Sequence, residues 1–132
     1  MKDKHTEQQI PQMPGDPKEA EALIAALTKK KKLAGLFGIA RKAGRVIAGT
    51  NLVVDGIRSG SPSRCPSAVF LASDVSDNTR KRVKNSCEYY QIPLYDIPLT
   101  VAEIGGAIGK SGSISAVGIT DSGLSDALAK LI

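Results

Sequence analysis

The sequence predicts a three-layer α/β/α sandwich around a small mixed central sheet of about four strands. Three observations indicate this fold class. Short apolar segments alternate along the chain with segments of helical periodicity. Glycine, proline, serine and aspartate separate the two kinds of segment, as turn residues do. The connections between strands are short crossovers, so we expect at least part of the sheet to be parallel.

The first part of the chain divides into a leader and a domain. Residues 1–17 are polar, contain three prolines and show no apolar period, so we expect a disordered leader. The single domain is expected to occupy 18–132. A helix should begin at Asp16 or Pro17 because Asp caps helices and Pro suits the first turn.

This first helix carries a run of four lysines. Either one helix continues to Lys42, or two helices meet near Thr28, where the lysines interrupt the apolar spacing. Gly44 is expected to end it. A short strand over 46–48 and a helix over 50–59 follow.

The middle of the chain predicts one buried strand and one amphipathic helix. The apolar run at 67–72 is bounded by turn residues, which is typical of a strand buried on both faces. The helix at 77–90 places Val83, Cys87 and Tyr90 on one side.

The last third repeats the alternation. A strand is expected at 94–97 and another at 115–120, followed by a closing helix from about Ser122. Between them, Thr100 and Glu103 have the spacing of a capping box, with a hydrophobic staple from the apolar residues on either side.

Composition excludes several classes of protein. Aromatic residues make up 4% and Trp is absent, so a platform that stacks single-stranded bases is poorly supplied. No apolar run approaches the roughly 20 residues that span a bilayer, and the N-terminus does not resemble a signal peptide. We therefore expect a cytoplasmic protein with no membrane partner. Cys65 and Cys87 are expected to be reduced thiols, although a disulfide stays open.

Charge is distributed unevenly. Residues 1–17 have 2 basic and 3 acidic side chains (−1), residues 18–64 have 10 and 3 (+7), and residues 65–132 have 6 and 7 (−1). A field of this kind attracts polyanions. For the lysine run alone, a solubilising helix face is the simpler interpretation.

Catalytic and cofactor sites find little support. The glycine-rich segment 104–111 lacks the spacing of a phosphate-binding loop, and close helix packing explains Gly105 and Gly106 better. The single His lies in the leader, and no cluster of metal ligands is evident. We therefore expect no enzyme, no metal and no cofactor.

The best candidate site is Gly49–Thr50–Asn51 at a helix start. Thr50 is placed to cap the helix, Gly49 allows a ligand to approach the backbone, and the amide of Asn51 suits a base edge. A plain loop with a cap is the alternative. Cationic residues just before this segment favour a nucleic-acid ligand: they are Arg41, Lys42 and Arg45.

The order of motifs resembles the kink-turn RNA-binding ribosomal proteins, which include the seven-Ae, thirty-e, twelve-e and Gadd types. The resemblance rests on LFGIARKAGRVIAGTN, FLASDVSDNTRKRV, IPLYDIP, AEIGGAIGK and AVGITDSGLSDAL, and covers about residues 30–131. It is most similar to the short bacterial, YlxQ-like members. It implies an α/β/α sandwich that binds kinked RNA duplexes within ribosomal or other translation-related assemblies.

The resemblance also implies which residues contact RNA. Gly49, Thr50 and Asn51 match the first three positions of the Gly-Thr-Asn-Glu-x-x-Lys pattern of the family. The loop that packs on the kink matches a second segment, from which Lys110, Ser111 and Ile114 are expected to contribute.

This chain departs from the family pattern at two positions. The Glu position is Leu52 and the Lys position is Asp55. An aspartate near phosphates repels them, so we expect weaker selectivity for kink-turns. The alternative is a protein-interaction module on the same fold, with Leu52 in an apolar contact patch. Nothing in the sequence indicates an obligate dimer, so a monomer is expected.

Overall fold

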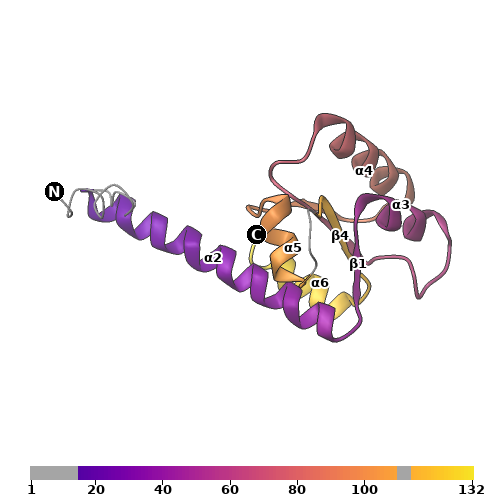
Figure 1. Ribbon diagram of the computed structural model, residues 1–132, viewed down its shortest axis with the longest axis horizontal. Coiled ribbons are helices and arrows are strands. Elements are labelled where there is room, and N and C mark those ends of the chain that lie inside the picture. The colour runs from indigo at the N-terminus through magenta and orange to yellow at the C-terminus, as the bar shows by residue number, and fades with distance from the viewer. Residues whose placement is uncertain (1–14, 110–113) are drawn as a thin grey trace.

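The computed structural model describes residues 15–109 and 114–132, and within them it is a three-layer α/β/α sandwich (Figure 1). Its helices are α2 (Pro17–Lys42), α3 (Thr50–Arg58), α4 (Asp77–Tyr90), α5 (Val101–Ala107) and α6 (Ser122–Ala129). Its strands are β1 (Val46–Ala48), β2 (Ala68–Leu71), β3 (Leu94–Asp96) and β4 (Ala116–Ile119). The predicted fold class is therefore confirmed. The leader lies almost entirely outside the described residues.

The four strands form a mixed sheet in the order β1-β4-β2-β3. Strands β2 and β3 are parallel, whereas β4 runs antiparallel to both of its neighbours. Gly118 of β4 lies opposite Ile47 on one side and Val69 on the other. It follows that β1, β2 and β3 all point the same way, and their carboxyl ends lie along one edge of the sheet.

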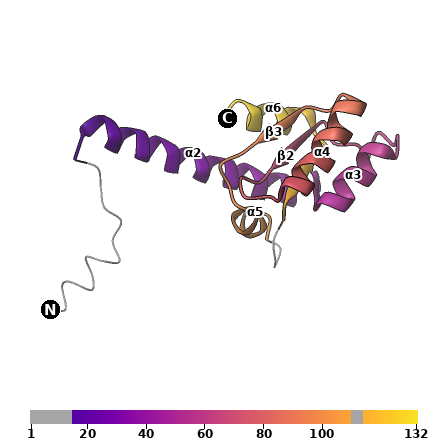
Figure 2. The ribbon, with the colours of Figure 1, turned by 90° about the horizontal axis from the view of Figure 1, so that it is seen from above.

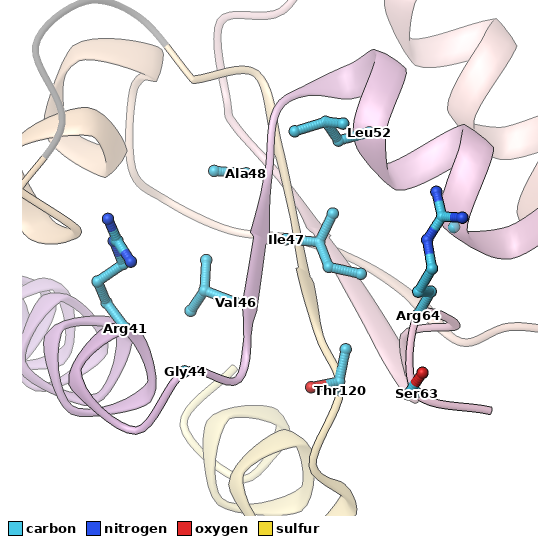
Figure 3. A pocket seen from close by; sticks show the side chains of 10 residues that line it. Arg41, Gly44, Val46, Ile47, Ala48, Leu52, Ser63, Arg64 and Thr120 are labelled. Carbon is cyan, nitrogen blue, oxygen red and sulfur yellow. The ribbon is translucent and has the colours of Figure 1, made fainter. Parts of the chain in front are cut away.

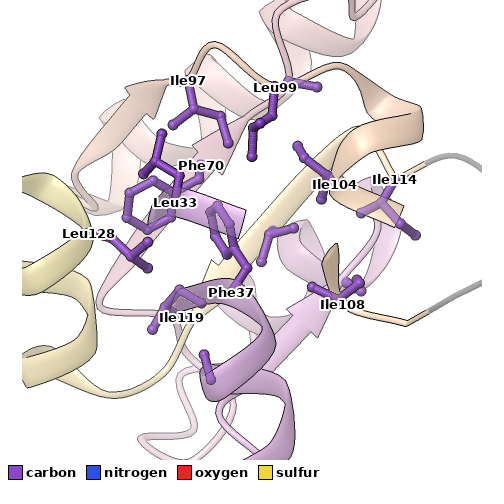
Figure 4. Close-up of a cluster of buried hydrophobic side chains, with 14 of the residues drawn as sticks. Leu33, Phe37, Phe70, Ile97, Leu99, Ile104, Ile108, Ile114, Ile119 and Leu128 are labelled. Atoms are coloured by element: carbon purple, nitrogen blue, oxygen red, sulfur yellow. The ribbon is translucent and has the colours of Figure 1, made fainter. Parts of the chain in front are cut away.

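The larger hydrophobic core lies between the sheet and the helices α2, α5 and α6 (Figure 4). Phe37 of α2 meets Phe70 of β2 edge to face, with ring centroids 5.6 Å apart. Tyr95 stacks on the same Phe70 ring at 5.4 Å. Such aromatic pairs add to the burial energy of the rings, so they help fix α2 on the sheet.

The smaller core joins the opposite face of the sheet to α3 and α4. Val83 and Cys87 of α4 are buried there as predicted, but Tyr90 is exposed: it is the last residue of the helix, and its ring lies edge to face against the exposed Tyr89 ring. Both cysteines are free thiols. Burial raises the pKa of the Cys87 thiol to about 11, since the thiolate would be poorly solvated.

Helix α2 is continuous through the lysine run, so the first of the two alternatives is correct. Asp16 caps it, accepting a hydrogen bond from the Lys18 N–H at 2.9 Å. Gly44 follows its C-terminus with a φ of +73°, a conformation that favours glycine. Only the second half of the helix lies on the sandwich; the first half extends away from it (Figures 1 and 2).

The start of α5 is capped by three acceptors. Thr100 and Glu103 form the predicted capping box, each side chain accepting the other residue's backbone N–H, at 3.1 and 3.0 Å. Asp74, from the loop after β2, accepts the N–H of Val101 at 2.8 Å. The hydrogen bond from the Thr100 N–H and the ammonium of Lys30 at 3.0 Å lower the pKa of Glu103.

Helix α5 lies close to α2, but not through the predicted glycines alone. Gly105 is buried, whereas a Cβ built on Gly106 would meet nothing within 4 Å. The close approach is at Gly38, whose Cβ position lies 3.3 Å from the carbonyl oxygen of Ala107. The tight contact therefore depends on a glycine of α2.

Candidate functional site

The candidate site lies at the edge of the sheet where the parallel strands end. Such carboxyl ends are where open α/β sheets commonly bind ligands. Gly49, just after β1, donates its N–H to the carbonyl of Ala116 at 2.9 Å. The carbonyl oxygen of Ser115, the residue before Ala116, accepts the N–H of Ala72, which directly follows β2. The start of α3 and the segment leading into β4 are therefore neighbours.

Gly49 gives the start of α3 its shape. Its φ of +105° and ψ of 144° form a conformation that favours glycine, and its carbonyl accepts the N–H of Val53 at 3.0 Å. Gly49 is thus the N-cap, and the expectation that Thr50 caps the helix is wrong. Because the chain turns one residue earlier, Thr50 is already the first helical residue.

The cap leaves backbone donors available. Gly49 has no side chain to accept a hydrogen bond, and within the described chain no group accepts from the N–H groups of Thr50, Asn51 or Leu52. These donors also carry the positive end of the helix dipole. The first turn of α3 can therefore bind an anionic or carbonyl oxygen.

Asn51 is held by a residue that the sequence analysis did not single out. Its Oδ1 accepts a hydrogen bond from Arg82 of α4 at 2.7 Å. A guanidinium has only donors, so the oxygen must face it and the Asn51 NH₂ group points elsewhere. Arg82 adds a positive charge at the site. The sequence gives no signal of this contact, because Arg82 and Asn51 are 31 positions apart.

The three basic residues before β1 lie farther from this edge than their closeness in sequence suggests. Arg45 and Gly49 flank opposite ends of β1, and the three strand residues between them make four steps along the chain, a separation of about 13 Å. Arg41 and Lys42 are in the last turn of α2, near the same far end of the strand. All three are exposed. They form a second basic region rather than part of the helix start.

A hollow of about 320 Å³ runs along β1 between these two regions (Figure 3). Arg41 lies on one side of the strand, Arg64 and Leu52 on the other. Leu52 is 53% exposed, and Asp55 one turn later is also exposed. The two departures from the family pattern therefore lie on the surface, where a ligand of this region would meet them.

The second predicted segment is only partly visible. Lys110 and Ser111 lie outside the described residues. Ile114 is 9% exposed, belongs to the larger core and donates its N–H to the carbonyl of Val101 at 3.1 Å. Its side chain therefore anchors the segment to the core rather than facing a ligand.

Metal and membrane chemistry find no support in the described part of the chain. Residues 15–109 and 114–132 contain no group of three or more His, Cys, Asp or Glu side chains placed to hold a metal ion. Within the same ranges, no helix is both long enough and apolar enough to cross a membrane.

Comparison with known proteins gives a consistent result. Residues 31–129 match the ribosomal protein L7Ae/L30e/S12e/Gadd45 family. The RNA-binding protein YlxQ of Enterococcus faecium is 35% identical over 78% of this chain and 93% of its own length. YlxQ of Bacillus subtilis (strain 168) is 34% identical over 74% and 91%, respectively.

Two solved structures share the fold. A protein of unknown function from Bacillus halodurans superposes with a TM-score of 0.67 at 32% identity, covering 76% of this chain and 95% of that protein. A 15.5 kDa RNA-binding protein of Giardia lamblia gives 0.61 at 18% identity, covering 79% and 84%.

Proposed function

Because the chain belongs to the ribosomal protein L7Ae/L30e/S12e/Gadd45 family, we propose that it is an RNA-binding protein, not an enzyme, that recognises a structured, kink-turn-like RNA through the start of α3. The relatives named as RNA-binding proteins cover most of the chain. A ribosomal or other translation-related assembly is the setting we propose, since an archaeal relative, from Methanosarcina mazei, is a large ribosomal subunit protein.

The observation that carries the proposal is the set of donors at the start of α3. The backbone N–H groups of the first turn, the Asn51 NH₂ group and the Arg82 guanidinium all lie at the end of β1. Base edges present acceptors in the grooves, and phosphates present only acceptors. A cluster of donors next to a positive helix end therefore suits RNA better than an apolar ligand.

We propose that Arg41, Lys42 and Arg45 contact the RNA backbone away from the specific site. All three are exposed and lie near the end of β1 opposite to Gly49, a position that suits contact with a duplex continuing past the recognised pairs. Such contacts contribute affinity that depends on salt but carry little sequence information. Lys110 and Ser111 remain part of the proposed surface on the basis of the family pattern alone.

Leu52 and Asp55 should weaken the recognition. Both are exposed on the first two turns of α3, so Asp55 would meet RNA phosphates with a like charge. Loss of one charged contact with a nucleic acid costs about 1–3 kcal/mol. We therefore propose a binder with lower kink-turn selectivity than members of the family that have Glu and Lys at these positions.

The test compares two RNAs near physiological salt: a kink-turn, and the same duplex with its tandem G·A pairs replaced by Watson–Crick pairs. We expect the kink-turn to bind more than tenfold tighter. Asn51→Ala should remove that preference, whereas Asn85→Ala, an exposed asparagine of α4, should not. Equal affinity for the two RNAs that falls steeply with salt would show that the protein binds phosphates through a basic surface without recognising the kink-turn. Absence of binding to either RNA would overturn the proposal.

One observation favours protein interaction as a second candidate function. Leu52 is exposed beside the hollow along β1, an arrangement that suits an apolar side chain of a partner. Leu52→Glu separates the two candidates. It should leave RNA binding unchanged or improve it, because Glu is the family residue, and it should abolish binding of a protein partner that fills the hollow.

A further inference from the structure

Helices α3 and α4 lie side by side over the smaller hydrophobic core (Figures 1 and 2). Val53 of α3 and Val83 of α4 are both fully buried in that core. Asn51 lies two residues before Val53, and Arg82 lies one residue before Val83. The buried packing therefore fixes the backbone positions from which the two polar side chains reach each other.

The contact between these two side chains has a defined direction. A guanidinium nitrogen of Arg82 donates to Oδ1 of Asn51 at 2.7 Å. A guanidinium carries only donors, so it cannot accept a hydrogen bond from the Asn51 NH₂ group. The amide has two orientations that differ by a half turn, and only one of them fits this neighbour. Arg82 thus decides which end of the amide faces away from α4.

The charge of Arg82 is available at this contact. The structure gives two ion pairs within the described residues, and Arg82 belongs to neither. Asp55, the one acidic residue of α3, lies a turn after Asn51 but is not paired with Arg82. A hydrogen bond from a charged donor polarises the amide that accepts it, so the N–H groups of Asn51 become stronger donors.

We propose, on the basis of the proposed RNA-binding function, that Arg82 positions Asn51 for recognition. It holds the amide oxygen toward α4 and presents both N–H donors of the exposed Asn51 to the ligand. The backbone N–H groups in the first turn of α3 add further donors to the same site. Asn51 therefore binds acceptors, and a residue of another helix determines this.

The orientation restricts which base edge Asn51 can bind. The bidentate pairing of an asparagine with adenine needs the amide oxygen and the NH₂ group to face the same base. With the oxygen turned toward Arg82, this pairing is disfavoured, and an edge that presents acceptors is favoured. Arg82 therefore contributes to specificity without contacting the base.

A phosphate contact is the simpler role for Arg82. Helix α4 carries four basic residues between positions 80 and 84, and any of them could bind the RNA backbone. Such a contact adds salt-dependent affinity for every RNA. The positioning of Asn51 affects only the RNA that Asn51 recognises. The ratio between the affinities for two RNAs therefore separates the two roles.

The test repeats the comparison between the kink-turn and its Watson–Crick-paired duplex with variants of the full-length chain. Arg82→Met keeps an apolar stem but removes the donor and the charge. It should lower the preference for the kink-turn roughly three- to tenfold, the contribution of one hydrogen bond. Arg82→Lys, which keeps a charged donor, should retain most of the preference. Lys81→Met, the matched control at an exposed neighbour, should weaken binding of both RNAs equally.

Charge reversal tests the direction of the hydrogen bond. A carboxylate has only acceptors, so Arg82→Glu should draw the Asn51 NH₂ group toward α4 and turn the amide oxygen to the ligand. This variant should lose the kink-turn preference as fully as Asn51→Ala does. Lys81→Glu makes the same change of charge one residue away. It should lower both affinities and keep the preference.

A double-mutant cycle shows whether Arg82 acts through Asn51. In the Asn51→Ala background, Arg82→Met should lower the affinity for the kink-turn no more than Lys81→Met does, because the amide that Arg82 positions is gone. A larger loss from Arg82→Met in that background would mean that Arg82 acts on the RNA by itself, and would overturn the proposal.

The contact can also be checked without RNA. In nitrogen–proton correlation spectra of the free chain, Arg82→Met should shift the side-chain NH₂ signals of Asn51, whereas Lys81→Met should not. Unchanged Asn51 signals, or an Arg82→Met variant with the full kink-turn preference, would overturn this inference and leave the proposed RNA binding standing. Absence of RNA binding by the parent chain would overturn the proposed function and this inference with it.

Discussion

Gly56 is a residue whose side-chain size is fixed by its surroundings. It lies in α3 beneath the segment that carries Arg64, and a Cβ at this position would lie 2.4 Å from the Arg64 carbonyl oxygen. Backbone atoms cannot move aside as a flexible side chain can. Overpacking of this kind costs about 1–3 kcal/mol.

We therefore expect Gly56→Ala to lower the free energy of unfolding by about 1–2 kcal/mol, since the higher helix propensity of Ala offsets part of the clash. Gly106→Ala is the matched control, because Gly106 is helical and its Cβ position is open. It should be neutral or stabilising by up to about 1 kcal/mol. Urea unfolding followed by circular dichroism measures both. A Gly56→Ala variant as stable as the parent would contradict the close approach.

At the same scale, the site could be predicted only in part. The sequence locates the Gly49–Asn51 segment because Gly, Thr and Asn are informative at helix starts. That Gly49 rather than Thr50 is the N-cap depends on a φ of +105°, which a sequence does not show. The hydrogen bond from Arg82 to Asn51 depends on α3 packing beside α4, so no local pattern could indicate it.

At the scale of elements, the helices and strands lie close to their predicted bounds. Helix α4 begins at Asp77 and ends at Tyr90 as expected, because Ser76 caps it and Gln91 adopts a left-handed conformation. In the sequence, the lysine run of α2 leaves two alternatives open, since like charges disfavour a helix locally. Lys30 is stabilised by Glu103 of another element, which the sequence of α2 alone could not reveal.

The capping box of α5 predicts how stability responds to acid. The pKa of Glu103 is lowered in the folded chain, so its ionised form stabilises the fold above its ordinary pKa, and that stabilisation is lost as pH falls through the folded-state value. Glu103→Gln keeps a capping side chain but loses the charge. It should therefore flatten the fall in stability between about pH 5 and pH 3.

Thr100→Ala should behave differently, costing about 0.5–2 kcal/mol at neutral pH, because it removes the acceptor for the Glu103 N–H. Urea unfolding at several pH values distinguishes the two variants. An unchanged acid response in Glu103→Gln would show that other carboxylates dominate it.

At the scale of the whole molecule, the layers could be predicted but the order of strands could not. Alternation of strands and helices indicates a sandwich, yet pairing β4 between β1 and β2 joins segments about 50 and 70 residues apart. The same limit explains Arg41, Lys42 and Arg45. They precede Gly49 closely in sequence, but β1 lies between them and Gly49 and carries the chain from one end of the sheet to the other.

The extent of the independently folding unit is also a property of the whole molecule. No side chain before Leu33 belongs to either hydrophobic core of the described chain. We expect residues 28–132 to unfold cooperatively with a free energy within about 1 kcal/mol of the full chain. Leu33→Ala should cost about 2–5 kcal/mol, because Leu33 is fully buried. Loss of cooperative unfolding in 28–132 would mean that the first half of α2 supports the domain.

The central place of β4 also governs when the protein can fold during its synthesis. Strands β1, β2 and β3 leave the ribosome before β4, and in the described part of the chain β4 is the one strand that pairs with β1. Until residues 116–119 emerge, β1 has no strand to pair with, and β2 and β3 can pair with each other. The sheet therefore cannot close before β4 has been made, and the nascent chain carries an unpaired β1 strand while the residues between β1 and β4 are synthesised.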